Sequence, residues 1–255
     1  MQCQPLLCST AKVIHEAGGG ASEVWALNDH TFCKIKVLIP GTTLEHVTLA
    51  YLQKHDLGFE VPHVHHHEEY NGRYYIILSH VGGLTLAKAW PTMNDENKEY
   101  YVRRVAEICV QMAQWEGGST ISGVDGRNLS DQYLADKMGI VETDDLSPLK
   151  LLENCKVFGL ECSQLVFYHC DLGPGNIIVD LEKKTIGIID WETAGWVPKE
   201  WVRTKFRVSG GMDMEFEEHE MRIEWRRRVQ LELGRRGFPE AADKWNSWRR
   251  SLRGD

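Results

Sequence analysis

The chain has 255 residues, of which 42% are hydrophobic, and its formal net charge is −8. This composition is typical of a globular protein, and the negative charge argues against nucleic acid or an anionic membrane surface as a main partner. The sequence contains no apolar run long enough to span a membrane and no secretory signal, and its seven scattered cysteines form no C-x-x-C pair. We therefore expect a cytoplasmic protein with reduced thiols.

A glycine cluster is the first distinctive segment. Gly18, Gly19 and Gly20 lie between extended segments, where backbone N–H groups can approach phosphates. No Gly-Lys-Ser/Thr follows, so the cluster is not a Walker P-loop. A plain hairpin turn explains the glycines equally well.

A β-hairpin is predicted next. Residues 24–27 and 31–38 read as strands on either side of an Asn-Asp-His turn. Lys34 and Lys36 share one face of the second strand, because side chains alternate along a strand. One of these two lysines could reach the phosphates of a nucleotide.

A helix is expected to begin at Thr42 and to continue through Leu52. Thr42-x-x-Glu45 matches a capping box, in which the glutamate bonds the first turn of its own helix.

Further on, the histidines at 63–67 are a candidate metal cluster, because imidazole is a common zinc ligand. Alternate residues of an extended run face opposite ways, however, so a loop and edge strand leading into the strand 74–78 is favoured.

Apolar spacing predicts helices over 94–116, over 213–233 and from Phe238 onward, each with a core-facing stripe. The arginines of the second helix alternate with acidic residues and indicate a solvated face. Arg203, Lys205 and Arg207 recur at every second position. A surface strand or loop is the favoured interpretation of that pattern, with contact to an anionic substrate group as the alternative.

Residues 165–196 are the most informative stretch. Short apolar strands flank a glycine-containing loop that carries Asp171 and Asn176, and a later strand ends on Asp190. Transfer of a γ-phosphoryl group requires oxygen ligands for Mg²⁺ and a carboxylate that accepts the proton of the attacking hydroxyl. Asn176 and Asp190 can be the metal ligands, and Asp171 can be the base.

The segments H-C-D-L-G-P-G-N-I-I-V, from His169, and I-I-D-W-E, ending at Glu192, resemble the catalytic and metal loops of the aminoglycoside phosphotransferase/choline kinase group. The pattern D-W-E-x-A-G-W-x-P-x-x-W is most similar to the fungal-type branch. The resemblance implies an α+β, protein-kinase-like fold of two lobes. These would be an N-terminal antiparallel-sheet lobe (1–78), a hinge (79–83) and a mainly helical C-terminal lobe (84–255).

The resemblance also implies roles for individual residues. ATP and Mg²⁺ would be the cofactors, and the glycine cluster would cover the phosphates. Lys34, in preference to Lys36, would contact the α- and β-phosphates. Glu45 would then pair with Lys34, which is the alternative to its capping role. The backbone groups of Ser79 and Val81 would bind the adenine.

The resulting hypothesis is a kinase that phosphorylates a hydroxyl group of a small molecule. The alternatives are a kinase-fold protein that binds nucleotide or a partner without catalysis, and a fold adapted to other chemistry on a secondary metabolite. Protein kinase activity is disfavoured because Asp190-Trp191-Glu192 stands where protein kinases carry Asp-Phe-Gly. The sequence does not identify the acceptor.

Overall fold

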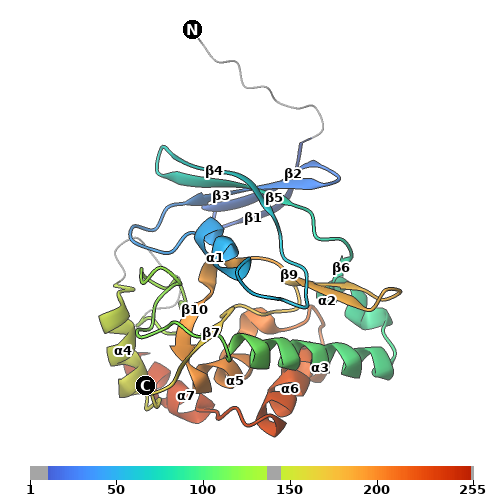
Figure 1. Ribbon diagram of the computed structural model, residues 1–255. Helices are drawn as coiled ribbons and strands as arrows, with labels where there is room; N and C mark the ends of the chain where they lie inside the picture. The colour runs from blue at the N-terminus through green and yellow to red at the C-terminus, as the bar shows by residue number, and fades with distance from the viewer. Residues whose placement is uncertain (1–10, 137–144, 254–255) are drawn as a thin grey trace. The chain divides into compact units, whose positions relative to one another are not determined.

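The computed structural model describes residues 11–136 and 145–253, so the first ten residues fall outside the account that follows (Figure 1). The chain divides into two compact units. The first unit comprises Met1–Pro40 and Val61–Val81, and the second comprises Gly41–Glu60 and Gly82–Asp255.

The first unit is a five-stranded antiparallel sheet with the strand order β1-β2-β3-β5-β4. Its strands are β1 (Lys12–Ala17), β2 (Ser22–Asn28), β3 (Thr31–Val37), β4 (Val64–Tyr70) and β5 (Arg73–Ser79). The predicted hairpin is therefore present as β2 and β3. Lys34 and Lys36 stand opposite Ile76 and Tyr74, so the two lysines share one face of the sheet as expected.

The three glycines form the turn between β1 and β2. Gly18, Gly19 and Gly20 have φ angles of 62°, 61° and 90°. Residues with a side chain rarely adopt this left-handed region, so the turn depends on glycine at these positions. The turn itself accounts for the glycines, and a role in binding phosphates remains an additional proposal.

The second unit is mainly helical. Its elements are α1 (Glu45–Leu52), β6 (Leu84–Thr85), α2 (Leu86–Ala89), η1 (Trp90–Thr92), α3 (Asp95–Met112), α4 (Pro148–Val157), β7 (Leu165–Tyr168), β8 (Ile177–Asp180), β9 (Thr185–Ile188), η2 (Trp191–Thr193), β10 (Gly195–Pro198), α5 (Lys199–Val208), η3 (Gly210–Met212), α6 (His219–Arg235) and α7 (Ala242–Arg253). Two small sheets, β10-β7 and β6-β8-β9, contain the strands of residues 165–196. The loops that carry the predicted catalytic and metal-binding residues connect these strands. Trp90, Trp191, Trp201 and Trp225 are fully buried in this unit.

Three predicted helix starts are wrong, and one of them is that of α7, which begins at Ala242 instead of Phe238. The first predicted helix begins at Glu45, with Leu44 as its N-cap residue, so Thr42 does not occupy the N-cap position that the capping box requires. Helix α6 begins at His219 instead of residue 213. The preceding residues fold back, because the backbone N–H of Met214 donates to the carbonyl oxygen of Arg222 over 2.8 Å.

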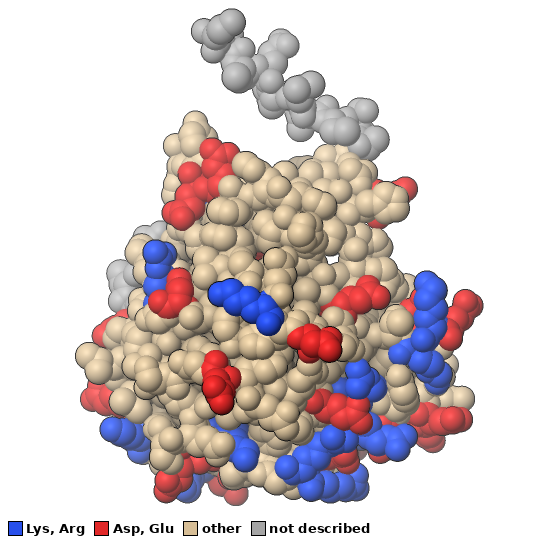
Figure 2. Space-filling model, viewed as in Figure 1, with Lys and Arg blue, Asp and Glu red and all other residues tan. Residues whose placement is uncertain are grey.

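The arginine-rich face of α6 is covered by ion pairs. Arg228 contacts Glu224 at 2.6 Å, Arg236 contacts Glu232 at 2.9 Å, and Arg226 contacts Asp213. On the face drawn in Figure 2, basic and acidic side chains are interspersed over the helical part. The side chains of these three arginines are only 32%, 27% and 17% exposed, in the order given, so the prediction of a solvated helix face does not hold for them. None of the described helices combines the length and the apolar character needed to cross a membrane.

Candidate active site

The loop after β7 and the residue after β9 are tied together by hydrogen bonds. The backbone N–H of Ile189 donates to the carbonyl oxygen of Asn176 over 3.0 Å. The ring Nε2 of His169 lies 2.9 Å from the carbonyl oxygen of Ile189, and its Nδ1 accepts from the backbone N–H of Asp171 at 3.2 Å. This pattern matches a neutral imidazole with its proton on Nε2. His169 thus braces the loop that carries Asp171 against the segment that carries Asp190.

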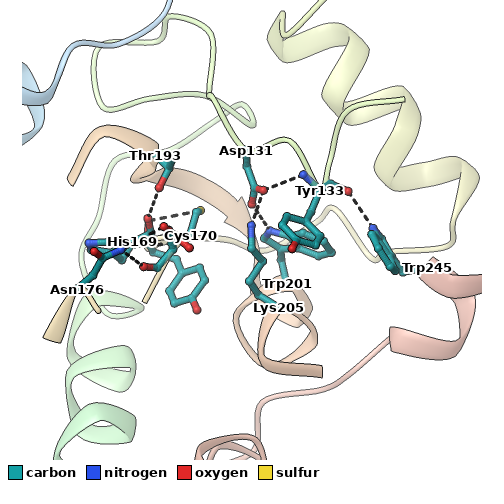
Figure 3. A network of polar contacts seen from close by, with 11 residues as sticks. Asp131, Tyr133, His169, Cys170, Asn176, Thr193, Trp201, Lys205 and Trp245 are labelled. Atoms are coloured by element: carbon teal, nitrogen blue, oxygen red, sulfur yellow. Dashed lines mark hydrogen bonds and ion pairs between the residues drawn. The ribbon is translucent and has the colours of Figure 1, made fainter. Parts of the chain in front are cut away.

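Asn176 is directed at Asp171. The side-chain amide nitrogen of Asn176 donates to the carboxylate Oδ2 of Asp171 at 3.1 Å and to its backbone oxygen at 2.9 Å. Figure 3 shows Asn176 and His169 on one side of this network. Because the amide nitrogen makes both bonds, the amide oxygen of Asn176 is the atom suited to a cation.

The proton affinity of Asp171 is altered by its surroundings. Burial is the largest cause that raises the pKa of this carboxyl to about 6. The ammonium group of Lys205 opposes the rise in pKa, whereas neighbouring carboxylates, Asp190 foremost, add to it. A carboxylate with a pKa close to neutral is suited to accept a proton at physiological pH.

Asp190 has an unusual backbone conformation. Its φ and ψ angles are 67° and 57°, in the left-handed region, which is costly for a residue with a side chain and is often found at functional sites. The next residue, Trp191, is held by two hydrogen bonds, one from its backbone and one from its side chain. The backbone N–H of Trp191 donates to Glu45 Oε1 at 3.1 Å, and its indole N–H donates to the Ile188 carbonyl oxygen at 2.9 Å. These bonds hold the strained turn.

A group of three carboxylates forms around this turn. Glu45, Asp190 and Glu192 each place a ligand atom within 4.8 Å of the other two. Hard oxygen donors at this spacing fit Mg²⁺. Asp190 was predicted as a metal ligand from the sequence, whereas Glu192 was missed. The signal that could have identified Glu192 is its Asp-x-Glu spacing from Asp190 at the end of a strand.

Lys205 does not lie on a surface strand or loop, and that prediction was wrong. It belongs to helix α5, is 3% exposed, and forms an ion pair at 2.5 Å with Asp131, which is 1% exposed (Figure 3). The indole N–H of Trp201 and the backbone N–H of Tyr133 also donate to Asp131, at 2.8 and 3.0 Å. A buried ion pair needs such additional bonds to offset desolvation. The sequence reasoning did not identify Asp131.

The remaining predicted site residues belong to the first unit, except Glu45. Lys34 lies on β3, and Ser79 is the last residue of β5. The backbone N–H of Ser79 donates to the His63 carbonyl oxygen at 2.9 Å, so this amide is committed to the sheet. Val81 is buried. Their proposed nucleotide contacts therefore rest on the resemblance.

Known proteins resemble this chain in sequence pattern and in fold. The model of the phosphotransferase enzyme family matches residues 14–198. Aminoglycoside phosphotransferase APH(3'')-Id from Streptomyces rimosus is similar with a TM-score of 0.59 and 16% identity, over 95% of this chain and 91% of that one. The streptomycin–ATP complex of APH(2'')-IIa is similar with a TM-score of 0.55 and 12% identity, over 97% and 82%. A search of curated proteins found no match.

Proposed function

Because the chain belongs to the phosphotransferase enzyme family, we propose that it transfers the γ-phosphoryl group of ATP to a hydroxyl group of a small molecule. The observation that carries this proposal is the contact between Asp171 and Asn176, with Asp190 close enough to raise the pKa of Asp171 by charge repulsion. Phosphoryl transfer needs one base and two kinds of oxygen ligand, and the proposal assigns these to Asp171, Asn176 and Asp190.

In the proposed reaction, Asp171 orients the acceptor hydroxyl and takes its proton as the oxygen attacks the γ-phosphorus in line, while the bond from the γ-phosphorus to the β,γ-bridging oxygen breaks and ADP leaves. Asn176 and Asp190 would hold Mg²⁺, and the carboxylate of Glu192 is close enough to Asp190 to take part. Mg²⁺, when bound, would neutralise charge on the nucleotide phosphates. The proposed site suits Mg²⁺ because the amide oxygen of Asn176 and the converging carboxylates are oxygen donors.

The first unit would bind the nucleotide. Lys34 would contact the α- and β-phosphates and pair with Glu45, and the turn of Gly18–Gly20 would cover the phosphates. Backbone groups of Ser79 and Val81 would contact the adenine. Solved structures of similar fold include an ADP-bound APH(2'')-Ib, which supports a nucleotide as the cosubstrate.

The test is the release of ADP from ATP by the full chain, measured with a panel of small hydroxyl compounds as acceptors and confirmed by mass analysis of the phosphorylated product. Asp171→Asn and Asp190→Asn should each abolish acceptor-dependent turnover while circular dichroism stays unchanged. Asp95→Asn is the matched control, because the Asp95 side chain is 89% exposed.

Retention of full turnover in either active-site variant would contradict the assigned roles. Nucleotide binding by calorimetry without ADP release for any acceptor would favour a binding protein. A modified product without an added phosphate group would favour other chemistry on the same fold.

A further inference from the structure

The histidine run lies along the edge of the five-stranded sheet. Strand β4 is the last strand in the order β1-β2-β3-β5-β4. Its pairing with β5 is interrupted by a bulge: Val64 stands opposite Leu78, but the next paired residue is His66, opposite Ile77. His65 is therefore an extra residue in β4.

The bulge changes which way the histidines face. Without it, His65 would stand opposite Ile77 and His66 would point to the other side of the sheet. With the extra residue, His66 shares the side of Ile77, and His65, which alternates with Val64, faces that side too. His63, two residues before His65, lies on the same side. The run forms an edge strand as expected, but the expectation that neighbouring residues face opposite ways is wrong for His65 and His66.

Two of these rings are already close together. The ring centres of His63 and His65 are 5.7 Å apart, with an angle of 77° between the ring planes. The backbone of His63 is fixed on both sides: its N–H donates to the Ser79 hydroxyl oxygen at 2.8 Å, and its carbonyl oxygen accepts from the Ser79 N–H at 2.9 Å. The backbone of His63 is therefore anchored to the end of β5.

We propose that His63 and His65 bind a divalent transition-metal cation such as Zn²⁺, with His66 as a third ligand after its side chain rotates, because the described residues whose ligand atoms already converge in a group of three are Glu45, Asp190 and Glu192. A metal–nitrogen bond of about 2.0–2.1 Å places each ring centre roughly 3.2 Å from the ion. Ring centres 5.7 Å apart then subtend roughly 125° at the ion. Closing the pair by about 0.5 Å gives the tetrahedral angle that Zn²⁺ prefers.

The donor chemistry selects the kind of ion. Imidazole nitrogen suits Zn²⁺, Cu²⁺ and Ni²⁺, whereas Mg²⁺ prefers oxygen. His66 now lies 3.8 Å from the Glu68 carboxylate, and its side chain is 60% exposed, so it can rotate toward the ion. Glu68 would then orient a bound imidazole by accepting its second N–H, as carboxylates do at many zinc sites.

The test uses the full chain without an affinity tag, stripped of metal by a chelator. Zn²⁺ is titrated by calorimetry in excess Mg²⁺, which competes with Zn²⁺ for the carboxylates of Glu45, Asp190 and Glu192. We expect one Zn²⁺ per chain, with affinity weakened at least tenfold in His63→Gln and His65→Gln and less in His66→Gln. His15→Gln is the matched control, because His15 is an exposed histidine of the strand at the other edge, β1.

X-ray absorption spectroscopy at the zinc edge supplies a second readout. It should show imidazole ligands of the ion, and these should be lost in His63→Gln. Absence of Zn²⁺ binding to the unmodified chain would overturn the proposal. So would binding that survives both His63→Gln and His65→Gln, or binding that is lost in Asp190→Asn, which would assign the zinc ion to the carboxylates.

Discussion

The side-chain amide of Asn176 donates a hydrogen bond of 3.1 Å to the carboxylate of Asp171, so the proposed metal ligand also orients the proposed base. Asn176→Ala should remove both functions. We expect kcat to fall by roughly 10²-fold or more, in the range expected for loss of a positioned base. Steady-state kinetics at several Mg²⁺ concentrations will measure this, and the concentration of Mg²⁺ needed for half-maximal rate should rise. An unchanged Mg²⁺ dependence would argue against the ligand role.

Asp171 should make the metal-free, nucleotide-free protein less stable as pH rises. Its pKa is raised to about 6 in the folded protein, so the folded state binds the proton more tightly than the unfolded state. Stability from this group is full below about pH 4 and is lost as pH rises through about 6. Asp171→Asn should therefore stabilise the protein by roughly 2–3 kcal/mol at pH 7 and by little at pH 4.

Urea unfolding of both proteins across that pH range measures the difference. A gap that stays constant, or that widens toward low pH, would contradict the raised pKa of Asp171. Asp95→Asn again serves as the control, because the Asp95 side chain is 89% exposed.

The buried pair of Lys205 and Asp131 should couple strongly. Lys205→Met leaves the Asp131 carboxylate buried without its cation, which costs about 3–5 kcal/mol of unfolding free energy. Asp131→Asn should cost a similar amount, and the double variant should cost less than the sum of the two. Denaturant unfolding of the four proteins gives the coupling energy.

The exposed pair of Arg227 and Glu220, 3.1 Å apart, is the control for that cycle. Its side chains are 64% and 67% exposed, so breaking it should change stability by less than about 1 kcal/mol. Simple additivity of Lys205→Met and Asp131→Asn would show that the buried contact is not an energetic unit.

Glu192 should affect the metal more than the fold. Its carboxylate lies within 4.8 Å of ligand atoms of Glu45 and Asp190, and Glu192→Gln removes one negative charge from this group. We expect roughly a 10-fold or greater rise in the Mg²⁺ concentration for half-maximal activity, with the unfolding midpoint unchanged. If activity fell at all Mg²⁺ concentrations equally, Glu192 would act on the acceptor instead.

The elements that could be predicted from the sequence are those with local signals. Apolar runs bounded by turn residues predicted β2, β3, β5 and the strands around Asp171, and alternation placed Lys34 and Lys36 on one face. The motif that contains Asp171, Asn176 and Asp190 predicted the kinase-like fold. It could be recognised in the sequence because its residues follow one another closely along the chain.

Contacts between distant segments were decided by the tertiary structure alone. Asp131 and Lys205 meet although neither has a pattern that predicts the other, and the carboxylate of Glu45 accepts a hydrogen bond from the backbone of Trp191, 146 residues away. Burial makes these contacts necessary, because an unpaired charge or N–H group away from water is costly. Local periodicity therefore determined which strands and helices form, whereas the need to pair buried polar groups determined which of their side chains meet.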